Sequence, residues 1–133
     1  MLYILDTDTC SYVIRGASDA LDARLAREEP QSLAISAVTR GELMFGLEKR
    51  GKPLALSRLV IGFLDNIAVM PWDAPAADQF ARLRAALERS GTPIGLMDTM
   101  IAGHALALGA TLVTNNQKHF RQVARLKMEN WSA

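Results

Sequence analysis

The chain has one cysteine, Cys10, among its 133 residues, so an internal disulfide is excluded and a reducing compartment such as the cytoplasm is favoured. No apolar run approaches the ~20 residues that a membrane-spanning helix needs. The N-terminus lacks a basic segment and a small-residue cleavage site, so we expect no signal peptide. Neither sign of charge dominates, because the formal net charge is +1. Bulk electrostatics therefore neither require nor exclude a nucleic-acid partner.

Short apolar runs alternate with helical patterns along the chain. Strands are predicted at 2–5, 33–35, 67–70 and 111–113, with a last edge strand around 126–128. The clearest helical pattern between them is the apolar stripe Leu56, Leu59, Val60, Phe63 and Leu64. This alternation predicts an α/β protein with a parallel sheet of four to five strands and helices on both faces. We expect a single domain over residues 1–133.

The first predicted strand runs directly into a polar segment, Asp6-Thr7-Asp8-Thr9. Ligands of α/β folds bind just outside the carboxyl ends of the strands, so Asp6 is expected at the mouth of a cleft. Taken alone, Asp6 fits a helix cap, a phosphorylated nucleophile or a metal ligand equally well.

Two further acids are predicted to converge on Asp6. Glu42 lies on the helix after the second strand, and Asp98 begins the helix that leads into the fourth. Each also has a structural interpretation, since Thr39 to Glu42 forms a T-x-x-E capping box and Asp98 suits a cap. Close acids repel by about 4 kcal/mol per pair at an effective dielectric near 20, so the cluster stays ionised only with a cation, or else some of its members protonate. Oxygen ligands without His or Cys favour Mg²⁺ or Mn²⁺.

Sequence blocks of one known family recur in order along nearly the whole chain. They are Leu5-Asp6-Thr7, Ser36-Ala37-Val38-Thr39 leading to Glu42-Leu43, Gly91-Thr92-Pro93-Ile94-Gly95 leading to Asp98, Met100-Ile101-Ala102-Gly103-His104-Ala105, and Val113-Thr114-Asn115-Asn116. With these blocks the chain resembles the PIN-domain ribonucleases, and within them the VapC toxins of bacterial VapBC toxin–antitoxin pairs. The resemblance implies a PIN-like three-layer α/β/α fold and hydrolysis of RNA, often tRNA, that inhibits translation. It also implies a homodimer and a VapB-like antitoxin.

The resemblance also assigns roles to the acids. It implies a catalytic site built on Asp6, Glu42 and Asp98 that binds Mg²⁺ or Mn²⁺. Asp6 and Asp98 are the expected direct ligands, while Glu42 acts through a water molecule and is a candidate base. Whether one metal or two operate stays open.

The chain departs from the family pattern at two positions. Many PIN domains carry a fourth acid where this chain has Asn116, which still offers a neutral oxygen ligand. Asp8 stands where the family usually has Asn, so whether Asp8 is a direct ligand also stays open. Thr114 and Asn116 are expected to orient the attacking water or a phosphate oxygen.

Basic residues near these positions are candidates for contacts with RNA phosphates. They are Lys49, Arg50, Lys52, Lys118 and Arg121. An ordinary solvated surface is the competing interpretation for each one taken singly.

The two histidines and the cysteine receive structural interpretations. His119 is predicted to be a loop surface residue outside the catalytic set. His104, on an Ala- and Leu-rich helix, is expected to pack in the core or at an interface, and Cys10 to be a small core residue.

Two other functions compete with the nuclease. Asp6-Thr7-Asp8-Thr9 begins a haloacid-dehalogenase-type phosphatase motif, but Cys10 occupies its fifth position and Thr114-Asn115-Asn116 supplies no acidic pair. A receiver module is disfavoured, because its phosphoacceptor Asp has a poor match at Met70-Pro71-Trp72-Asp73. A catalytically inactive PIN-like module that binds RNA or protein is opposed by the presence of all three acids.

Overall fold

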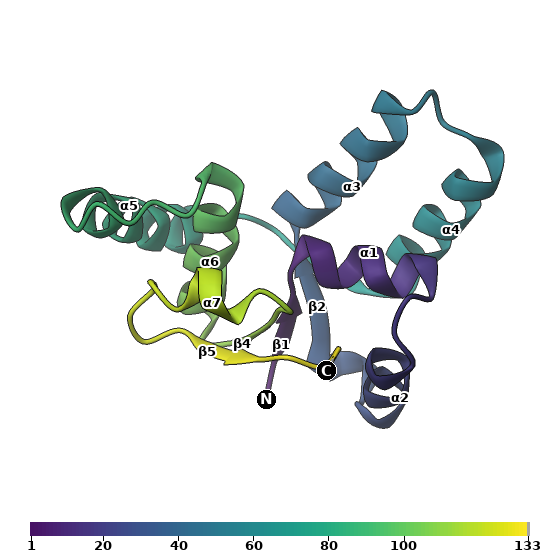
Figure 1. Ribbon diagram of the computed structural model, residues 1–133, viewed down its shortest axis with the longest axis horizontal. Helices are drawn as coiled ribbons and strands as arrows, with labels where there is room; N and C mark the ends of the chain where they lie inside the picture. The colour runs from purple at the N-terminus through teal and green to yellow at the C-terminus, as the bar shows by residue number, and fades with distance from the viewer. Residues whose placement is uncertain (133) are drawn as a thin grey trace.

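The computed structural model describes residues 1–132 and contains a parallel five-stranded sheet between two layers of helices (Figure 1). The order across the sheet is β3-β2-β1-β4-β5, and every neighbouring pair is parallel. The strands are β1 (Tyr3–Leu5), β2 (Leu33–Ser36), β3 (Ala68–Met70), β4 (Thr111–Val113) and β5 (Lys127–Glu129). The predicted three-layer α/β/α fold, with β5 as an edge strand, is confirmed.

Helices α1 to α4 lie on one face of the sheet, and α5 to α7 lie on the other (Figure 1). They are α1 (Thr7–Arg15), α2 (Asp19–Arg27), α3 (Ala37–Lys49), α4 (Leu54–Asp65), α5 (Ala74–Arg89), α6 (Leu96–Leu108) and α7 (Gln117–Phe120), with a 3₁₀ turn at Pro30–Ser32. Within residues 1–132, none of these helices has both the length and the apolar character needed to cross a membrane.

Successive residues of the central strands point into two separate cores, as the two-residue period of a strand requires. Ile4 and Leu112 pack with the buried faces of α5 and α6. Leu5 and Val113, one residue further on, pack with α1 to α4. Because both faces of the sheet are covered, the central strands β1, β2 and β4 are mostly apolar, which is why short apolar runs predicted them correctly.

The neighbouring strands β1 and β4 mark the point where the strand order reverses. From β1 the chain continues to β2 and β3 on one side, whereas β4 and β5 lie on the other. The Asp6 N–H donates to the Val113 carbonyl at 3.0 Å, which extends the pairing just past both strands. Such a reversal opens a crevice at the carboxyl ends of the strands. Asp6 and Thr114 both stand at this edge.

The first turn of α3 differs from a capping box. Ser36 caps the helix, since its Oγ accepts from the Val38 N–H at 3.1 Å, and Thr39 lies inside the helix. The helix therefore begins three residues before the start that a capping box at Thr39 requires. The capping-box interpretation of Glu42 is wrong, because Thr39 is not the cap and Glu42 bonds elsewhere.

Helix α6 begins two residues before the predicted start at Asp98. Its N-cap is Gly95, which has φ +94° and makes no side-chain capping bond. This backbone conformation favours glycine, so the residue type, and not a side-chain oxygen, decides where the helix starts. Asp98 is consequently inside the first turn, and its interpretation as a cap is wrong. Its carboxylate is left free for other contacts.

Candidate active site

Asp6 is both a helix cap and a buried acid. Its Oδ1 accepts from the Thr9 N–H at 2.8 Å at the start of α1, and only 3% of the residue is exposed. Burial raises the pKa of the Asp6 carboxyl, and hydrogen bonds from Thr114 and Thr9 oppose that rise. The cap and the site are therefore compatible, since the cap engages only one carboxylate oxygen.

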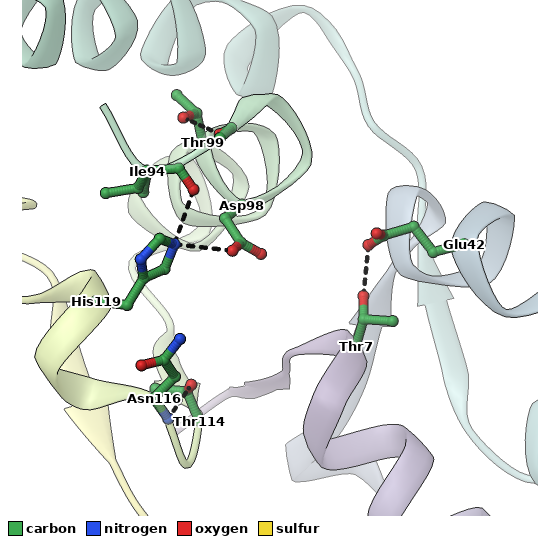
Figure 2. Close-up of polar contacts among 9 residues, drawn as sticks. Thr7, Glu42, Ile94, Asp98, Thr99, Thr114, Asn116 and His119 are labelled. Atoms are coloured by element: carbon green, nitrogen blue, oxygen red, sulfur yellow. Dashed lines mark hydrogen bonds and ion pairs between the residues drawn. The ribbon is translucent and has the colours of Figure 1, made fainter. Parts of the chain in front are cut away.

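Glu42 reaches across from α3 to the first residue of α1. The Thr7 hydroxyl donates to Glu42 Oε1 at 2.6 Å, and Thr7 Oγ1 also lies 3.1 Å from Thr39 Oγ1 (Figure 2). Burial is the main cause that raises the pKa of Glu42, and repulsion from Asp98, Asp8 and Asp6 adds to it. The sequence analysis assigned no role to Thr7, although the Leu-Asp-Thr block contained it.

Asp98 projects from the first turn of α6 toward the side on which Glu42 lies (Figure 2). Its Oδ2 is 3.0 Å from Nε2 of His119. Burial raises the pKa of Asp98, the adjacent His119 lowers it, and Asp8 raises it slightly. The prediction that His119 is a loop surface residue is wrong, because His119 lies on α7, is partly buried and contacts this acid.

The segment after β4 forms the third side of the site. Thr114 is fully buried, and its Oγ1 accepts from the Asn116 N–H at 2.9 Å (Figure 2). Asn116 precedes α7, is exposed, and makes no capping bond with its side chain. The buried threonine therefore fixes the turn, and the Asn116 amide remains available.

The acids lack the cationic partners that buried carboxylates usually have. Within residues 1–132, no Lys or Arg forms an ion pair with Asp6, Glu42 or Asp98. In the same residues, no three side chains of the His, Cys, Asp and Glu types are close enough to hold one metal ion by themselves. Mg²⁺ commonly takes one or two carboxylates and completes its shell with water and substrate phosphate. The all-oxygen donor set therefore fits a hard divalent cation with few direct protein ligands.

A groove of about 620 Å³ extends from the acids between α1, α3 and α4. Asp8 and Glu42 line it, together with the basic side chains of Arg15, Lys49 and Arg50. Two of the predicted phosphate contacts thus border the acidic site, joined by Arg15, which the sequence analysis did not single out.

The other three basic candidates do not line this groove. Lys52 pairs with Glu48 at 2.8 Å, on an exposed part of the surface. Lys118 lies on α7 and Arg121 directly after it, and both are exposed. The structure therefore divides the five candidates between two regions.

The remaining residues with structural interpretations occupy the core. His104 is buried, with Nδ1 2.8 Å from Ser36 Oγ, so it bridges α6 and the cap of α3. Cys10 is fully buried among the side chains of its face of the sheet.

The bond from Thr7 to Glu42 gives a testable expectation. Thr7→Val removes the hydroxyl at nearly constant volume, so Glu42 loses the donor that orients its Oε1. We expect nuclease turnover to fall by roughly 10–100-fold, as for other changes that leave a reactive carboxylate unoriented. Thr7→Ser keeps the donor and should retain most of the activity in the same cleavage assay. Equal activity of the Val and wild-type proteins would contradict this role.

Comparison with known proteins identifies the family. The PIN domain model matches residues 3–126. The chain is 38% identical over 130 residues to the tRNA(fMet)-specific endonuclease VapC of Shigella flexneri, and the match covers 98% of each protein.

Solved structures agree with the sequence match. VapBC2 of Rickettsia felis, bound to a DNA fragment from its promoter, superposes with a TM-score of 0.89 at 35% identity, covering 98% of this chain and 99% of the other. DNA-bound VapBC of Salmonella typhimurium superposes with a TM-score of 0.88 at 37% identity over the same shares. Membership of this nuclease family implies dependence on a divalent metal in general. The chain belongs to the PIN-domain family and, within it, to the VapC ribonucleases.

Proposed function

We propose that this protein is the endoribonuclease toxin of a VapBC pair and hydrolyses RNA phosphodiesters in the cytoplasm with Mg²⁺ or Mn²⁺. One observation carries the proposal. Three carboxylates with raised pKa values converge at the reversal point of the sheet, and no Lys or Arg within residues 1–132 pairs with them. Such a cluster is costly unless a cation occupies it.

Each acid has a distinct proposed role. Asp6 and Asp98 are the proposed direct ligands: Oδ1 of Asp6 is oriented by the Thr9 N–H, and Oδ2 of Asp98 by His119. Glu42 binds the cation through water and is the candidate base, oriented by Thr7. A cation bound here would stabilise the negative charge of the phosphate and lower the pKa of a water molecule that it binds. Asp8 is exposed at the rim and repels the other acids, so it is a further candidate ligand.

Other residues of the site hold the attacking water and the RNA. Thr114 fixes the turn that presents the Asn116 amide, which is suited to orient water or a phosphate oxygen. Lys49 and Arg50 line the groove beside Glu42 and are proposed to contact the RNA backbone. Lys118 and Arg121 provide a second basic region after Asn116. Lys52 is the weakest of the five candidates, since Glu48 already neutralises it.

The proposed substrate class and partners are those of the similar proteins described above. The Shigella flexneri relative is a tRNA(fMet)-specific endonuclease, so we propose tRNA as the substrate of this chain. The complexes from Rickettsia felis and Salmonella typhimurium are VapBC assemblies, so we propose a VapB-like antitoxin whose C-terminal segment covers the acidic cleft. A homodimer is the proposed state of the toxin.

The decisive test is metal-dependent cleavage by purified protein. We expect it to cut tRNA in Mg²⁺ or Mn²⁺ and to stop cutting in EDTA, with Asp98→Ala losing at least about 100-fold in rate. Asp65→Ala serves as the matched control, because Asp65 is an exposed acid at the end of α4 with no role in the proposed site. Induction of the chain should arrest growth, and a co-expressed antitoxin should relieve the arrest.

Specific outcomes separate the competing functions. RNA binding without cleavage by the folded wild-type protein would establish the inactive module instead. Hydrolysis of phosphate monoesters with intact RNA would favour the phosphatase. Sequencing the 5′ ends of the RNA fragments would identify the bond that is cut.

A further inference from the structure

One ring nitrogen of His119 faces two oxygens of neighbouring segments. Nε2 lies 2.8 Å from the Ile94 carbonyl oxygen and 3.0 Å from Oδ2 of Asp98 (Figure 2). A carbonyl oxygen can only accept a hydrogen bond, so Nε2 must carry the hydrogen in any arrangement that makes this contact. The same N–H therefore bridges the Ile94 carbonyl and the Asp98 carboxylate.

The His119 ring belongs to a segment that is held in place by a buried neighbour and by hydrogen bonds. Its neighbour Phe120 is almost fully buried in the core beneath α5 and α6, and the two rings meet edge to face at 5.3 Å. The His119 N–H donates to the Asn116 carbonyl at 3.1 Å, and Asn116 is itself held by the buried Thr114. Because Phe120 and Asn116 are both held in place, the position of the His119 imidazole is largely fixed, whatever the conformation of Asp98.

Ile94 and Asp98, the two partners of His119, lie at the start of α6, where no side chain within residues 1–132 caps the helix. Gly95, between Ile94 and α6, has φ +94° and contributes no side chain. Ile94 is buried and fixes one side of this turn, while Asp98 lies one turn further along. The bridge from His119 thus ties the turn and the carboxylate to each other. Figure 2 shows the second oxygen of Asp98 directed away from His119.

We propose that His119 is a positioning residue for Asp98: its Nε2–H holds Oδ2 and the Ile94 carbonyl together, so that Oδ1 is presented to the divalent cation. This inference rests on the proposed function of the site. Donors behind metal-binding side chains typically fix ligand orientation, and their loss costs 10–100-fold in metal affinity or activity. No Lys or Arg is paired with Asp98 in the part of the chain that the structure describes.

Two substitutions distinguish positioning from simple packing. The amide nitrogen of Gln can occupy nearly the place of Nε2, whereas the shorter Asn places its amide near Nδ1. We therefore expect His119→Gln to retain Mn²⁺ affinity within about threefold, and His119→Asn and His119→Ala to lose roughly 10–100-fold. The readout is Mn²⁺ binding by electron paramagnetic resonance on the full chain without RNA, which does not depend on turnover.

Cleavage kinetics provide the second readout. If His119 acts through Asp98, then saturating Mn²⁺ should restore most of the turnover of His119→Asn, because the reacting groups themselves are intact. Thermal unfolding in EDTA checks that each variant is folded. If His119→Ala fails to fold, the comparison of Gln with Asn decides alone, since both keep a polar side chain.

Different results would overturn the role of His119 and the proposed nuclease function. Equal Mn²⁺ affinity in the Gln, Asn and wild-type proteins would overturn the role of His119 while the nuclease function stands. Equal losses in Gln and Asn would likewise overturn it, because a donor at the Nε2 position would then be irrelevant. A wild-type protein that neither binds Mn²⁺ nor cleaves RNA would overturn the proposed function and this inference together.

Discussion

Asp6→Asn is expected to abolish RNA cleavage and, at the same time, to make the metal-free protein more stable at neutral pH. Asn keeps a side-chain oxygen that can cap α1 at the Thr9 N–H, so the local fold is retained. It removes a carboxylate that is almost completely buried and has no Lys or Arg partner within residues 1–132. The loss of a direct ligand should reduce cleavage by at least about 100-fold.

The stability gain depends on pH in a defined direction. Burial raises the pKa of Asp6 in the folded protein above its value of about 3.9 in the unfolded chain. Between these two pKa values the folded state binds more protons, so the stability of the wild-type protein falls as the pH rises through the folded-state pKa. Asp6→Asn lacks this titration. Its advantage should therefore be present at neutral pH and disappear below about pH 4.

Urea unfolding in EDTA at several pH values measures this difference. Asp73→Asn is the matched control, because Asp73 caps α5 through its Oδ1 in the same way at 3.2 Å from the Ala76 N–H but is exposed. That variant should show neither the stability gain nor the loss of cleavage. If the metal-free Asp6→Asn protein is less stable than the wild type at pH 7, the ionised Asp6 carboxylate does not destabilise the folded protein, and the prediction is wrong.

The sheet and the acids were predictable from the sequence because both have short-range signals. The apolar runs of β1 and β4 are continuous, since each strand is covered on both faces, and the family blocks contain Asp6, Glu42 and Asp98. Helix α4 forms where its apolar stripe predicted it, and four residues of that stripe pack in the core, whereas Leu59 is exposed. Where the hydrophobic pattern of a segment agrees with its packing, residue types alone are sufficient to predict the element.

The errors arose where a long-range contact replaced a local one. Thr39 to Glu42 has the sequence pattern of a capping box, but Ser36 caps the helix three residues earlier. Thr7, 35 residues from Glu42, binds the glutamate instead. His119 lies on the four-residue helix α7, which is too short to show a helical period. Its contact with Asp98 spans 21 residues, and nothing in the neighbouring sequence indicates it.

Gly103→Ala is expected to destabilise the protein strongly, although Ala is the better helix former. Gly103 is buried on α6 where this helix crosses α5. A Cβ atom there would lie 2.8 Å from the backbone nitrogen of Phe80 and 2.9 Å from its Cα. Backbone atoms of a packed helix cannot rotate aside as a flexible side chain can, so the two helices must separate. We expect a loss of about 1–3 kcal/mol in the free energy of unfolding, as for other overpacked cores.

Gly62→Ala provides the matched control for this effect. Gly62 lies within α4 and is exposed, and an added Cβ there meets nothing within 4 Å. The same substitution should therefore stabilise the protein by up to about 1 kcal/mol through helix propensity. Urea unfolding of the two variants should move in opposite directions. Equal stability of Gly103→Ala and the wild type would show that α5 and α6 are not held at this close contact.

The consequence of Gly103→Ala for the site follows from its position on α6. Asp98 lies on the same helix, five residues earlier, and depends on the fixed His119 ring for its orientation. A displacement of α6 away from α5 moves the carboxylate relative to that ring and to Asp6, which directly follows β1. We therefore expect the folded Gly103→Ala protein to bind Mn²⁺ more weakly, whereas Gly62→Ala should bind it normally. The close packing of two helices on one face of the sheet thus sets the geometry of the acids at its edge.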